Sequence, residues 1–410
     1  MQAPRPDPAS VLFVSRYYWP ELIGSAPFSS EMAEWLVGHG RKVTVLSGLP
    51  HYPMTEVFPA YRNGRGRQET VNGVHVERLD VAAPRGASAL WRVVNEAEFL
   101  AKGALALGGR RLRRHHVVLA LCPSILCVAL GLLARRPGGV CIAIVHDIQS
   151  GLAKGLGMVG GGGLARLMRW CERLVLNRAD QVVVLSPEMH DQLRRIGVTS
   201  PIEVMPIWVD TDHIKPADTP PHRAIKVVYS GNLGRKQGLG QIVALAEELA
   251  GRRPEIEIVV RGHGSQAEEL ASEIGTRQLT NIQLFPLQPQ QALGTALSAG
   301  DIHLVPQNPE AAAFAVPSKV FNIMAVGRPF VATCLPGSLL WQLQEKSGAF
   351  LCVPPNEASA FADAVIRLAD DAALRGELGR RGRAYVETHY AKPRILGDFV
   401  SRLDAISANA

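Results

Sequence analysis

The 410-residue chain has few cysteines, and they lack the paired spacing that marks metal sites. None of its six cysteines forms the C-x-x-C spacing of a zinc or redox site, so we expect reduced thiols in a cytosolic protein. No His/Cys/Asp cluster in the sequence indicates a metal, and we expect neither metal nor cofactor. The start of the chain has no cationic segment followed by an apolar one, so no signal peptide is expected.

Long uncharged apolar runs are also scarce. One stretch, residues 117–134, is long enough to be a candidate membrane span. Pro123 argues against a continuous helix, and the pattern favours a buried strand over 117–122 followed by an apolar helix over 124–134. We therefore expect a strand and a helix of a soluble protein here.

Length and composition predict a two-domain globular protein. Apolar residues make up 47% and charged residues 20% of a chain too long for one ordinary core. The net charge of +7 and the pI of 9.2 suit an anionic partner such as a nucleotide, nucleic acid or acidic membrane. Charge alone does not choose among these partners.

Short apolar runs alternate with helical segments along most of the chain, which predicts an α/β fold of parallel sheets covered on both faces. The runs form two doubly wound series, separated by a polar, proline-rich linker at 206–224. Ligands bind beyond the carboxyl ends of strands in such sheets, so a site is expected in a central cleft between the two domains. The runs are SVLFVS, KVTVLSG, HVERLD, VVLALC, VCIAIVHD and QVVVLS, then KVVYSG, IEIVVRG, NIQLFP, DIHLVPQ and PFVAT.

A glycine-rich turn follows the first run of the second series. The stretch YSGNLGRKQGLG, residues 229–240, surrounds Arg235 and Lys236 with four glycines, including Gly231 and Gly238. A strand, a glycine turn with cations and a helix form a plausible cradle for phosphate, although the stretch matches neither GxxxxGK[ST] nor GxGxxG. The alternative is that the two cations are only solvated.

Three further segments follow in the same half. Gly262 lies in a second strand-glycine-helix unit, and the apolar strand end from Phe285 to Leu287 could lie beside a flat base. The third segment, Pro317 and Ser318, opens a helix that places Lys319 in its first turn. A lysine is unfavourable there unless an anion is near, so this position indicates a phosphate ligand.

The first half offers two candidate sites. Gly24 and Ser25 lie in a loop before a helix expected from about Ser29 to Gly38, where backbone amides can face an anion. His146 and Asp147 end a buried strand and should point into the cleft. The alternatives are an ordinary turn for the glycine and a capping role for the His-Asp pair.

These motifs together resemble the retaining GT-B glycosyltransferases of family 4. The resemblance rests on YSGNLGRKQGL, VVRGHG, VPSKVFNIMAVGRPFVAT and the N-terminal YWPELIGSAPFSSEMAEWLVGHGRKVTVLSGLPHYP, and is strongest with the bacterial exopolysaccharide branch of colanic-acid type. It implies two Rossmann-like domains, one for the acceptor at 1–208 and one for the nucleotide-sugar donor at 209–391. The last segment, 392–410, would be a helix that returns to the first domain.

The resemblance also implies roles for single residues. Gly24 with Ser25 would approach the donor phosphate, His146 would lie near the transferred sugar, and the turn from Gly231 to Gly238 with the Pro317-Ser318-Lys319 segment would hold the diphosphate. We therefore assign catalytic roles to His146 and Lys319.

The chain departs from the family pattern at four positions. The usual arginine and lysine of the turn are replaced by Asn232 and Gln237, and two usual glutamates by Phe314 and Asn322. Asn322 can still bind ribose hydroxyls, whereas Phe314 cannot replace a carboxylate, which makes Glu310 a substitute candidate. We interpret these changes as chemistry of the subfamily, with positive charge supplied by Arg235, Lys236 and Lys319.

The expected function is metal-independent transfer of a hexose-type sugar, with retention, from a nucleotide diphosphate sugar to a glycan or lipid-linked acceptor. Two alternatives remain, a GT-B epimerase or phosphorylase and a nonenzymatic nucleotide-sugar binder. No nucleic-acid partner is expected. Residues 110–116, RRLRRHH, follow an apolar segment and could rest on the anionic inner face of the cell membrane, or could be a solvated helix end.

Overall fold

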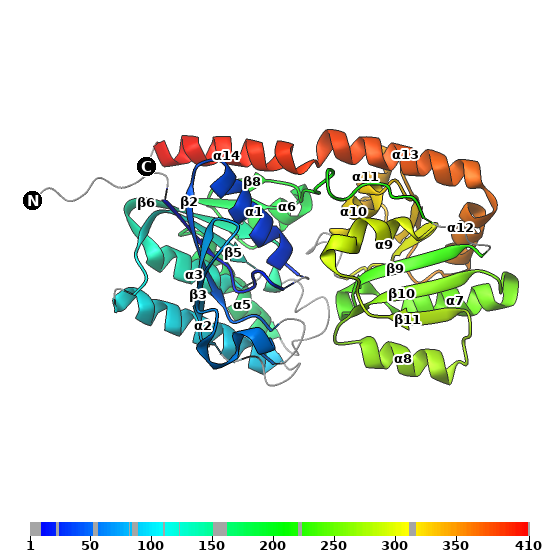
Figure 1. Cartoon of the computed structure of the whole chain (residues 1–410), viewed down its shortest axis with the longest axis horizontal. Helices are drawn as coiled ribbons and strands as arrows, with labels where there is room; N and C mark the ends of the chain where they lie inside the picture. Colours follow the sequence, from blue (N-terminus) through cyan, green and yellow to red (C-terminus); the bar gives the residue numbers. More distant parts are fainter. Residues whose placement is uncertain are drawn as a thin grey trace, which may run out of the picture. The chain divides into compact units, whose positions relative to one another are not determined.

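The computed structural model describes residues 10–21, 24–51, 56–81, 83, 89–109, 111–122, 124–150, 162–219, 224–310 and 317–408. The chain divides into two compact units, each built around a mainly parallel sheet (Figure 1). The first unit contains Met1–Met205 and Leu396–Ala410, and the second contains Pro206–Ile395. The predicted α/β class with two Rossmann-like sheets is confirmed.

The sheet of the first unit has eight strands in the order β3-β4-β2-β1-β5-β6-β7-β8. Its described pairs are parallel except for the β3–β4 hairpin at one edge. The strands are β1 (Ser10–Val14), β2 (Lys42–Gly48), β3 (Gln68–Val71), β4 (Val74–Leu79), β5 (His115–Cys122), β6 (Arg135–Val145), β7 (Gln181–Val184) and β8 (Ile202–Val204). The helices are α1 (Ala26–Gly38), α2 (Ala89–Gly108), α3 (Ile125–Ala134), α5 (Gly162–Leu176) and α6 (Pro187–Arg195), with a 3-10 segment η1 at Pro59–Gly64.

The long apolar stretch is a strand and a helix, as predicted. β5 ends at Cys122 and α3 begins at Ile125, where the Ser124 hydroxyl caps the helix by accepting from the Leu126 amide at 3.3 Å. Pro123 itself lies outside the described residues. In the part of the chain that is described, no helix combines the length and apolar character needed to cross a membrane.

The sheet of the second unit has six parallel strands in the order β11-β10-β9-β12-β13-β14. The strands are β9 (Lys226–Asn232), β10 (Glu257–His263), β11 (Ile282–Phe285), β12 (Ile302–Val305), β13 (Phe330–Thr333) and β14 (Leu351–Val353). The helices are α7 (Gly240–Arg252), α8 (Ala267–Thr276), α9 (Leu293–Ser298), α10 (Lys319–Ala325), α11 (Leu339–Ser347), α12 (Ala358–Asp370) and α13 (Ala372–His389), with 3-10 segments η2 (Arg235–Gln237) and η3 (Gln290–Ala292).

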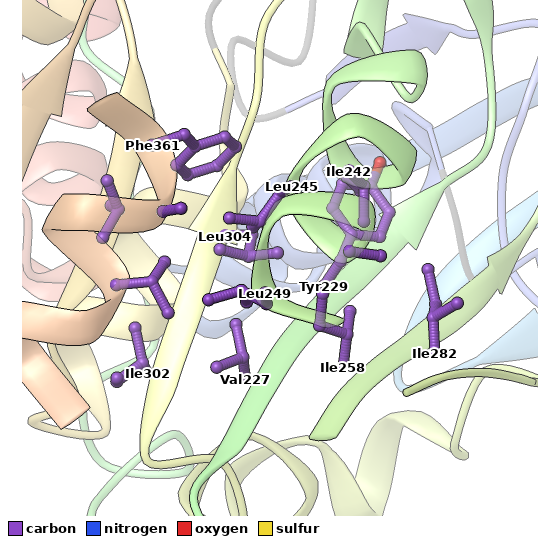
Figure 2. Close-up of a cluster of buried hydrophobic side chains, with 14 of the residues drawn as sticks. Val227, Tyr229, Ile242, Leu245, Leu249, Ile258, Ile282, Ile302, Leu304 and Phe361 are labelled. Atoms are coloured by element: carbon purple, nitrogen blue, oxygen red, sulfur yellow. The ribbon is translucent and has the colours of Figure 1, made fainter. Parts of the chain in front are cut away.

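The core of the second unit lies between β9, β10 and β12 and the helices α7 and α12. Apolar residues of α7 recur at the i, i+3, i+7 spacing of one helix face, which buries them against the sheet. This packing fixes β9 as the buried centre of the sheet. Figure 2 shows cluster residues from α7 near those of the strands: Ile242, Leu245, Leu249, Val227, Tyr229, Ile258 and Leu304.

Two details differ from the sequence prediction. The first helix begins at Ala26 and not near Ser29, because Pro27 stands in its first turn, where its fixed φ favours a helix start. Strands β3, β8 and β14 were not predicted, since they are short and only partly buried, and their sequences show no strong strand pattern. They adopt strand structure because they pair with a neighbouring strand of the sheet.

Helix α14 (Lys392–Ala408) begins in the second unit and ends in the first. Leu396, Phe399 and Leu403 of α14 are buried, at a spacing that places them on one helix face. Two ion pairs join the same part of the helix to the first unit, Arg402 with Glu203 and Asp404 with Arg41. The first unit is therefore assembled from two separate parts of the chain.

Two glycines of α13 provide a test of the packing in the second unit. A Cβ at Gly379 would lie 2.1 Å from the Gly327 carbonyl oxygen, whereas a Cβ at Gly376 would meet nothing within 4 Å. We expect Gly379→Ala to lower the free energy of unfolding by about 1 to 3 kcal/mol through overpacking. The matched Gly376→Ala should raise it by about 0.5 to 1 kcal/mol, because alanine favours the helix. Urea unfolding followed by circular dichroism measures both, and shifts of the same sign would contradict the close approach of α13 to Gly327.

Candidate functional site

The candidate site of the second unit lies at the carboxyl end of its central strand. β9 pairs with β10 on one side and with β12 on the other. The chain runs outward from β9 through β10 and β11, and then returns to β12 on the opposite side. Ligands of open α/β sheets bind where the strand order reverses in this way. The predicted glycine-rich turn follows β9 directly, at this reversal point.

The turn is tightly packed. Gly231 pairs in register with Gly262 of β10, and a Cβ at Gly262 would lie 2.2 Å from the Gly231 carbonyl oxygen. Gly238 has a left-handed φ of 63°, and a Cβ there would meet the Gln241 side chain at 2.4 Å. The Asn308 amide donates to the Lys236 carbonyl at 3.1 Å. The glycines are therefore required by close backbone approaches, and the loop has one fixed path.

Lys319 packs against the end of β9. As predicted, α10 begins at Lys319, directly after Pro317 and Ser318. The Lys319 Nζ lies 3.7 Å from the centroid of the Tyr229 ring, and a Cβ at Gly231 would lie 3.1 Å from this nitrogen. Absence of a side chain at Gly231 thus makes the space that the ammonium group occupies. The structure brings together two predicted residues that are far apart in the sequence.

The Lys319 ammonium group is buried without a hydrogen-bond partner among the described residues. Burial disfavours its charged form and lowers its pKa to about 7. The Tyr229 ring provides some attraction through its π face, and its hydroxyl donates to the Asn232 carbonyl at 2.7 Å, which fixes the ring. A ring face cannot accept three N–H hydrogen bonds, so an anion beside Nζ would supply what the site lacks.

The cations and amides of the turn itself are less buried. The Arg235 side chain is exposed, and Lys236 and Gln237 are half-buried on η2. Exposure at Arg235 fits a solvated side chain as well as a ligand contact. Asn232 lies over the turn, since Cβ atoms at Gly234 and Gly264 would lie 3.3 Å and 2.6 Å from its side-chain amide. Asn232 therefore packs the loop in place of an arginine.

The remaining candidates of the second unit occupy different positions. Asn322 is half-buried one turn after Lys319, on the same side of α10. Glu310 is exposed, and its amide donates to the Asn308 side chain at 2.9 Å. Phe314 lies outside the described residues.

The apolar strand end predicted beside a base belongs to an edge strand. Phe285 ends β11, is 44% exposed and pairs in register with Arg261 of β10. Leu287 follows it and is half-buried. β10 separates both residues from β9, so they lie at the same end of the sheet as the glycine turn but two strands away.

The first unit brings together the candidates before α1 and after β6. Gly24 has a left-handed φ of 72°. Ser25 follows it, and its buried hydroxyl has no partner among the described residues. His146 is 8% exposed, its amide donates to the Cys122 carbonyl at 2.8 Å, and its ring meets the edge of Phe28 from α1 at 5.8 Å between centroids. The Gly24-Ser25 loop and His146 therefore both border the first turn of α1.

Sequence reasoning missed a buried arginine in the first unit. Arg16 lies two residues after the end of β1 and is 2% exposed. Its Nη2 donates to the Asn95 side chain at 2.7 Å, while Nε and Nη1 have no hydrogen-bond partner among the described residues. Its place after a central strand was the available signal, because β1 pairs with both β2 and β5 at the strand reversal of this sheet.

A buried carboxylate five residues after Arg16 fixes the loop that follows β1. Glu21 is buried and accepts from the Tyr18 amide at 3.2 Å and from the His51 amide at 2.9 Å. Burial, with a smaller effect from the charge of Arg16, lowers the pKa of His51 to about 4. His51 is therefore neutral at pH 7. Across the described chain, no group of three or more His, Cys, Asp or Glu side chains is placed to hold a metal ion.

The buried Lys319 ammonium predicts a pH-dependent stability. The pKa of Lys319 is about 7 in the folded chain, against an ordinary value of 10.5 when unfolded. Between these values the unfolded chain binds more protons, so this group makes the free energy of unfolding rise with pH. We expect Lys319→Met to be more stable than the parent below pH 7, by a margin that shrinks as pH rises toward 10.5.

Urea titrations of Lys319→Met and of the parent across this pH range measure the difference. Lys346→Met, which removes an exposed lysine of α11, is the matched control. A stability difference that does not change with pH would show that the Lys319 ammonium is not buried as described.

Two family profiles match consecutive parts of the chain. Residues 24–208 match the profile described as a glycosyl transferase 4-like domain, and residues 210–385 match the glycosyl transferases group 1. Two solved structures share the fold over nearly the whole chain. They are sucrose-phosphate synthase of Thermosynechococcus elongatus (TM-score 0.78, 17% identity, 98% of this chain and 100% of that chain) and Anabaena Alr3699/HepE in complex with UDP and glucose (TM-score 0.69, 15% identity, 96% and 99%).

A full-length relative gives a stronger sequence match. The chain is 30% identical over 403 residues to an Escherichia coli K12 protein named as a colanic acid biosynthesis glycosyl transferase, WcaI. The match covers 94% of this chain and 97% of the relative. The family resemblance predicted from the motifs is confirmed, and so are the two Rossmann-like sheets of the GT-B fold. The chain belongs to the group 1 glycosyltransferases, the family 4 enzymes of the GT-B fold.

Proposed function

We propose that this glycosyltransferase retains the anomeric configuration and moves a hexose-type sugar from a UDP-linked donor to a glycan or lipid-linked acceptor. The proposal rests on the Lys319 ammonium group at the end of β9, which is buried without a hydrogen-bond partner among the described residues and could bind the donor diphosphate. The choice of UDP follows the ligand named for Alr3699/HepE, and the surface-polysaccharide role follows the name of WcaI. Retention is inferred from family membership.

Donor binding is assigned to the second unit, residues 209–391 in our domain assignment, and acceptor binding to residues 1–208. Gly231 and Gly262 let backbone approach the diphosphate closely, while Lys319 supplies charge and hydrogen bonds. The other assigned donor contacts come from the turn, the edge strand and the α10 segment: Asn232, Arg235, Lys236, Gln237, Phe285, Leu287, Glu310, Pro317, Ser318 and Asn322. In the first unit, we assign contacts with the donor phosphate to Gly24 and Ser25, and a contact with the transferred sugar to His146.

The chemical role of Lys319 follows from its environment. As the glycosidic bond to the diphosphate stretches, negative charge grows on the leaving oxygen. An ammonium group already held in a buried position stabilises that charge without reorganisation. A diphosphate beside Nζ would also raise the pKa of Lys319 from about 7, so donor binding takes up a proton near neutral pH. This arrangement supports transfer without a divalent metal. A cytoplasmic location, at the inner face of the cell membrane, is inferred from family membership.

The phosphate assignment is tested with Lys319→Ala. A charge-assisted hydrogen bond contributes about 1.5 to 3 kcal/mol, so we expect UDP affinity to fall by about 10 to 150-fold. Uridine has no diphosphate and its affinity should change little. Isothermal titration calorimetry with both ligands measures this, and Lys346→Ala controls for loss of a surface lysine. Equal weakening of UDP and uridine would assign Lys319 to the fold or the base pocket.

The role of His146 is tested by turnover. We expect His146→Ala to lower kcat for sugar transfer by at least about 100-fold, with little change in UDP affinity, because its proposed role is in the transition state. His39→Ala, at the exposed end of α1, is the control.

Reactions run in EDTA, with and without acceptor, test the function itself. Donor consumption without acceptor would favour an epimerase or phosphorylase. Activity that is lost in EDTA and restored by magnesium would refute metal independence.

A further inference from the structure

Helices α2, α3 and α5 form one outer surface of the first unit, which we call the three-helix surface. α3 packs against α2 and against α5, and contacts β1, β5 and β6 beneath it. Right-handed crossovers explain this arrangement, because connections that advance in one direction across a parallel sheet place their helices on the same face. Figure 1 shows the three helices on the same part of the unit. The sides of these helices that point away from the sheet therefore form one solvent-facing surface.

The three-helix surface exposes an unusual amount of apolar side chain. Eight of the twelve large apolar residues that are exposed in the described chain lie on it. The fractions exposed run from 36% at Leu174 to 74% at Leu105, and two of the residues are tryptophans. Single exposed apolar residues need no explanation, but a gathering of this kind marks an interaction surface. The eight are Trp91, Val93, Val94, Leu105, Leu133, Leu167, Trp170 and Leu174.

Helix α5 mixes this apolar character with charge of one sign. Leu167, Trp170 and Leu174 recur at helical spacing, with the exposed Arg166 and Arg173 on the same side. The one acidic residue of α5, Glu172, is buried, and its carboxylate accepts from the Ser150 amide at 3.0 Å and from the Ser150 hydroxyl. The exposed stripe of α5 is therefore cationic and apolar, and α5 itself adds no exposed carboxylate to it.

Residues 111–116 of the basic segment follow α2 at one end of this surface, and only some of them are exposed. Arg111, Arg113 and Arg114 are exposed, whereas Leu112 is 3% exposed and anchors the loop. His115 and His116 are half-buried members of β5, and burial lowers the pKa of His115. The last two residues of the segment therefore belong to a strand, and the exposed positive charge comes from the loop before it.

Three of the apolar residues lie toward the edge of the sheet at which the loop arginines lie. α2, α3 and α5 each end shortly before the strand that follows, β5, β6 and β7. These strands are parallel neighbours, so their starts line the same edge. Leu105, Leu133 and Leu174 therefore lie toward the edge at which the arginine loop enters β5.

We propose that the three-helix surface docks the enzyme on an anionic lipid bilayer. Trp170, Leu167 and Leu174 would enter the interface between headgroups and acyl chains, and the arginines of α5 and of the 111–114 loop would contact the anionic headgroups. Helices that lie in the membrane interface typically carry tryptophan and leucine beside arginine, and α5 has this pattern. The exposed charges of α5 and of the 111–114 loop are all positive, which favours an anionic bilayer over a single protein partner, whose contacts require matched polar groups. The inference does not depend on the sugar-transfer reaction.

Vesicle flotation of the full chain tests the proposal. We expect binding to vesicles of phosphatidylcholine mixed with phosphatidylglycerol, falling as salt rises, and little binding to phosphatidylcholine alone. The triple variant Leu167→Ser/Trp170→Ser/Leu174→Ser should bind the mixed vesicles at least about tenfold more weakly. Leu284→Ser/Leu335→Ser, which removes exposed apolar residues of the second unit, should bind as the parent does.

Charge and burial are tested separately. Arg111→Gln/Arg113→Gln/Arg114→Gln should weaken binding more than Arg65→Gln/Arg252→Gln/Arg277→Gln, which changes the net charge equally at exposed sites elsewhere. Trp170→Phe should keep binding but lose part of the fluorescence blue shift that vesicles produce. If the serine variant does not fold by circular dichroism, the corresponding triple alanine variant replaces it.

Four outcomes would overturn the proposal. They are no binding to either vesicle, equal binding to neutral vesicles, undiminished binding of the apolar variant, and a concentration-dependent dimer that the apolar variant abolishes while lipid binding is absent. Transfer to a water-soluble acceptor should be unchanged in the apolar variant, so failure of docking is distinguishable from failure of the proposed reaction.

Discussion

The candidate donor site depends on one buried ammonium group that has no hydrogen-bond partner among the described residues. Lys319 lies over the Tyr229 ring and fills the space that Gly231 leaves open at the end of β9. A buried charge without a partner is costly, and folded chains keep such a group mainly where a ligand completes it. The tight glycine turn, the pairing of Gly231 with Gly262 and the start of α10 at Lys319 all hold this group in place.

The two sheets carry the same kind of incompletely paired polar group at their strand reversals. In the first unit the buried guanidinium of Arg16 has two nitrogens without partners, and the Ser25 hydroxyl has none among the described residues. Buried polar atoms normally have hydrogen-bond partners, so the lack of partners at these atoms requires an explanation. Both lie after strand or loop ends where the topology brings ligands, and both are thus suited to bind polar groups of substrates.

Much of this fold could be predicted because buried parallel strands have a strong local pattern. β1, β5 and β9 are continuous apolar runs, and Pro123 was enough to divide a strand from α3. The glycine turn and Lys319 could also be found, since glycines and an unfavourably placed lysine are local signals. What Lys319 touches could not, because its contact with Tyr229 and Gly231 depends on how α10 packs on β9.

Other features are fixed only by tertiary contacts. Burial of Arg16 depends on Asn95 of α2 and on the absence of a side chain at Gly48. The short strands β3, β8 and β14 are strands because each pairs with a neighbouring strand of its sheet. The three-helix surface likewise could not be separated from ordinary core-facing helices, because α2, α3 and α5 are apolar on more than one side and only the packed sheet shows which side is left outside.

Helix α14 has a consequence for the order of events during synthesis. Domains fold as they leave the ribosome when their residues are contiguous. Pro206–Ile395 are contiguous, whereas the first unit lacks the buried Leu396, Phe399 and Leu403 until translation has passed both units. The half of the enzyme that is made first is therefore completed last, and the apolar surface that these three residues cover stays open while the second half folds.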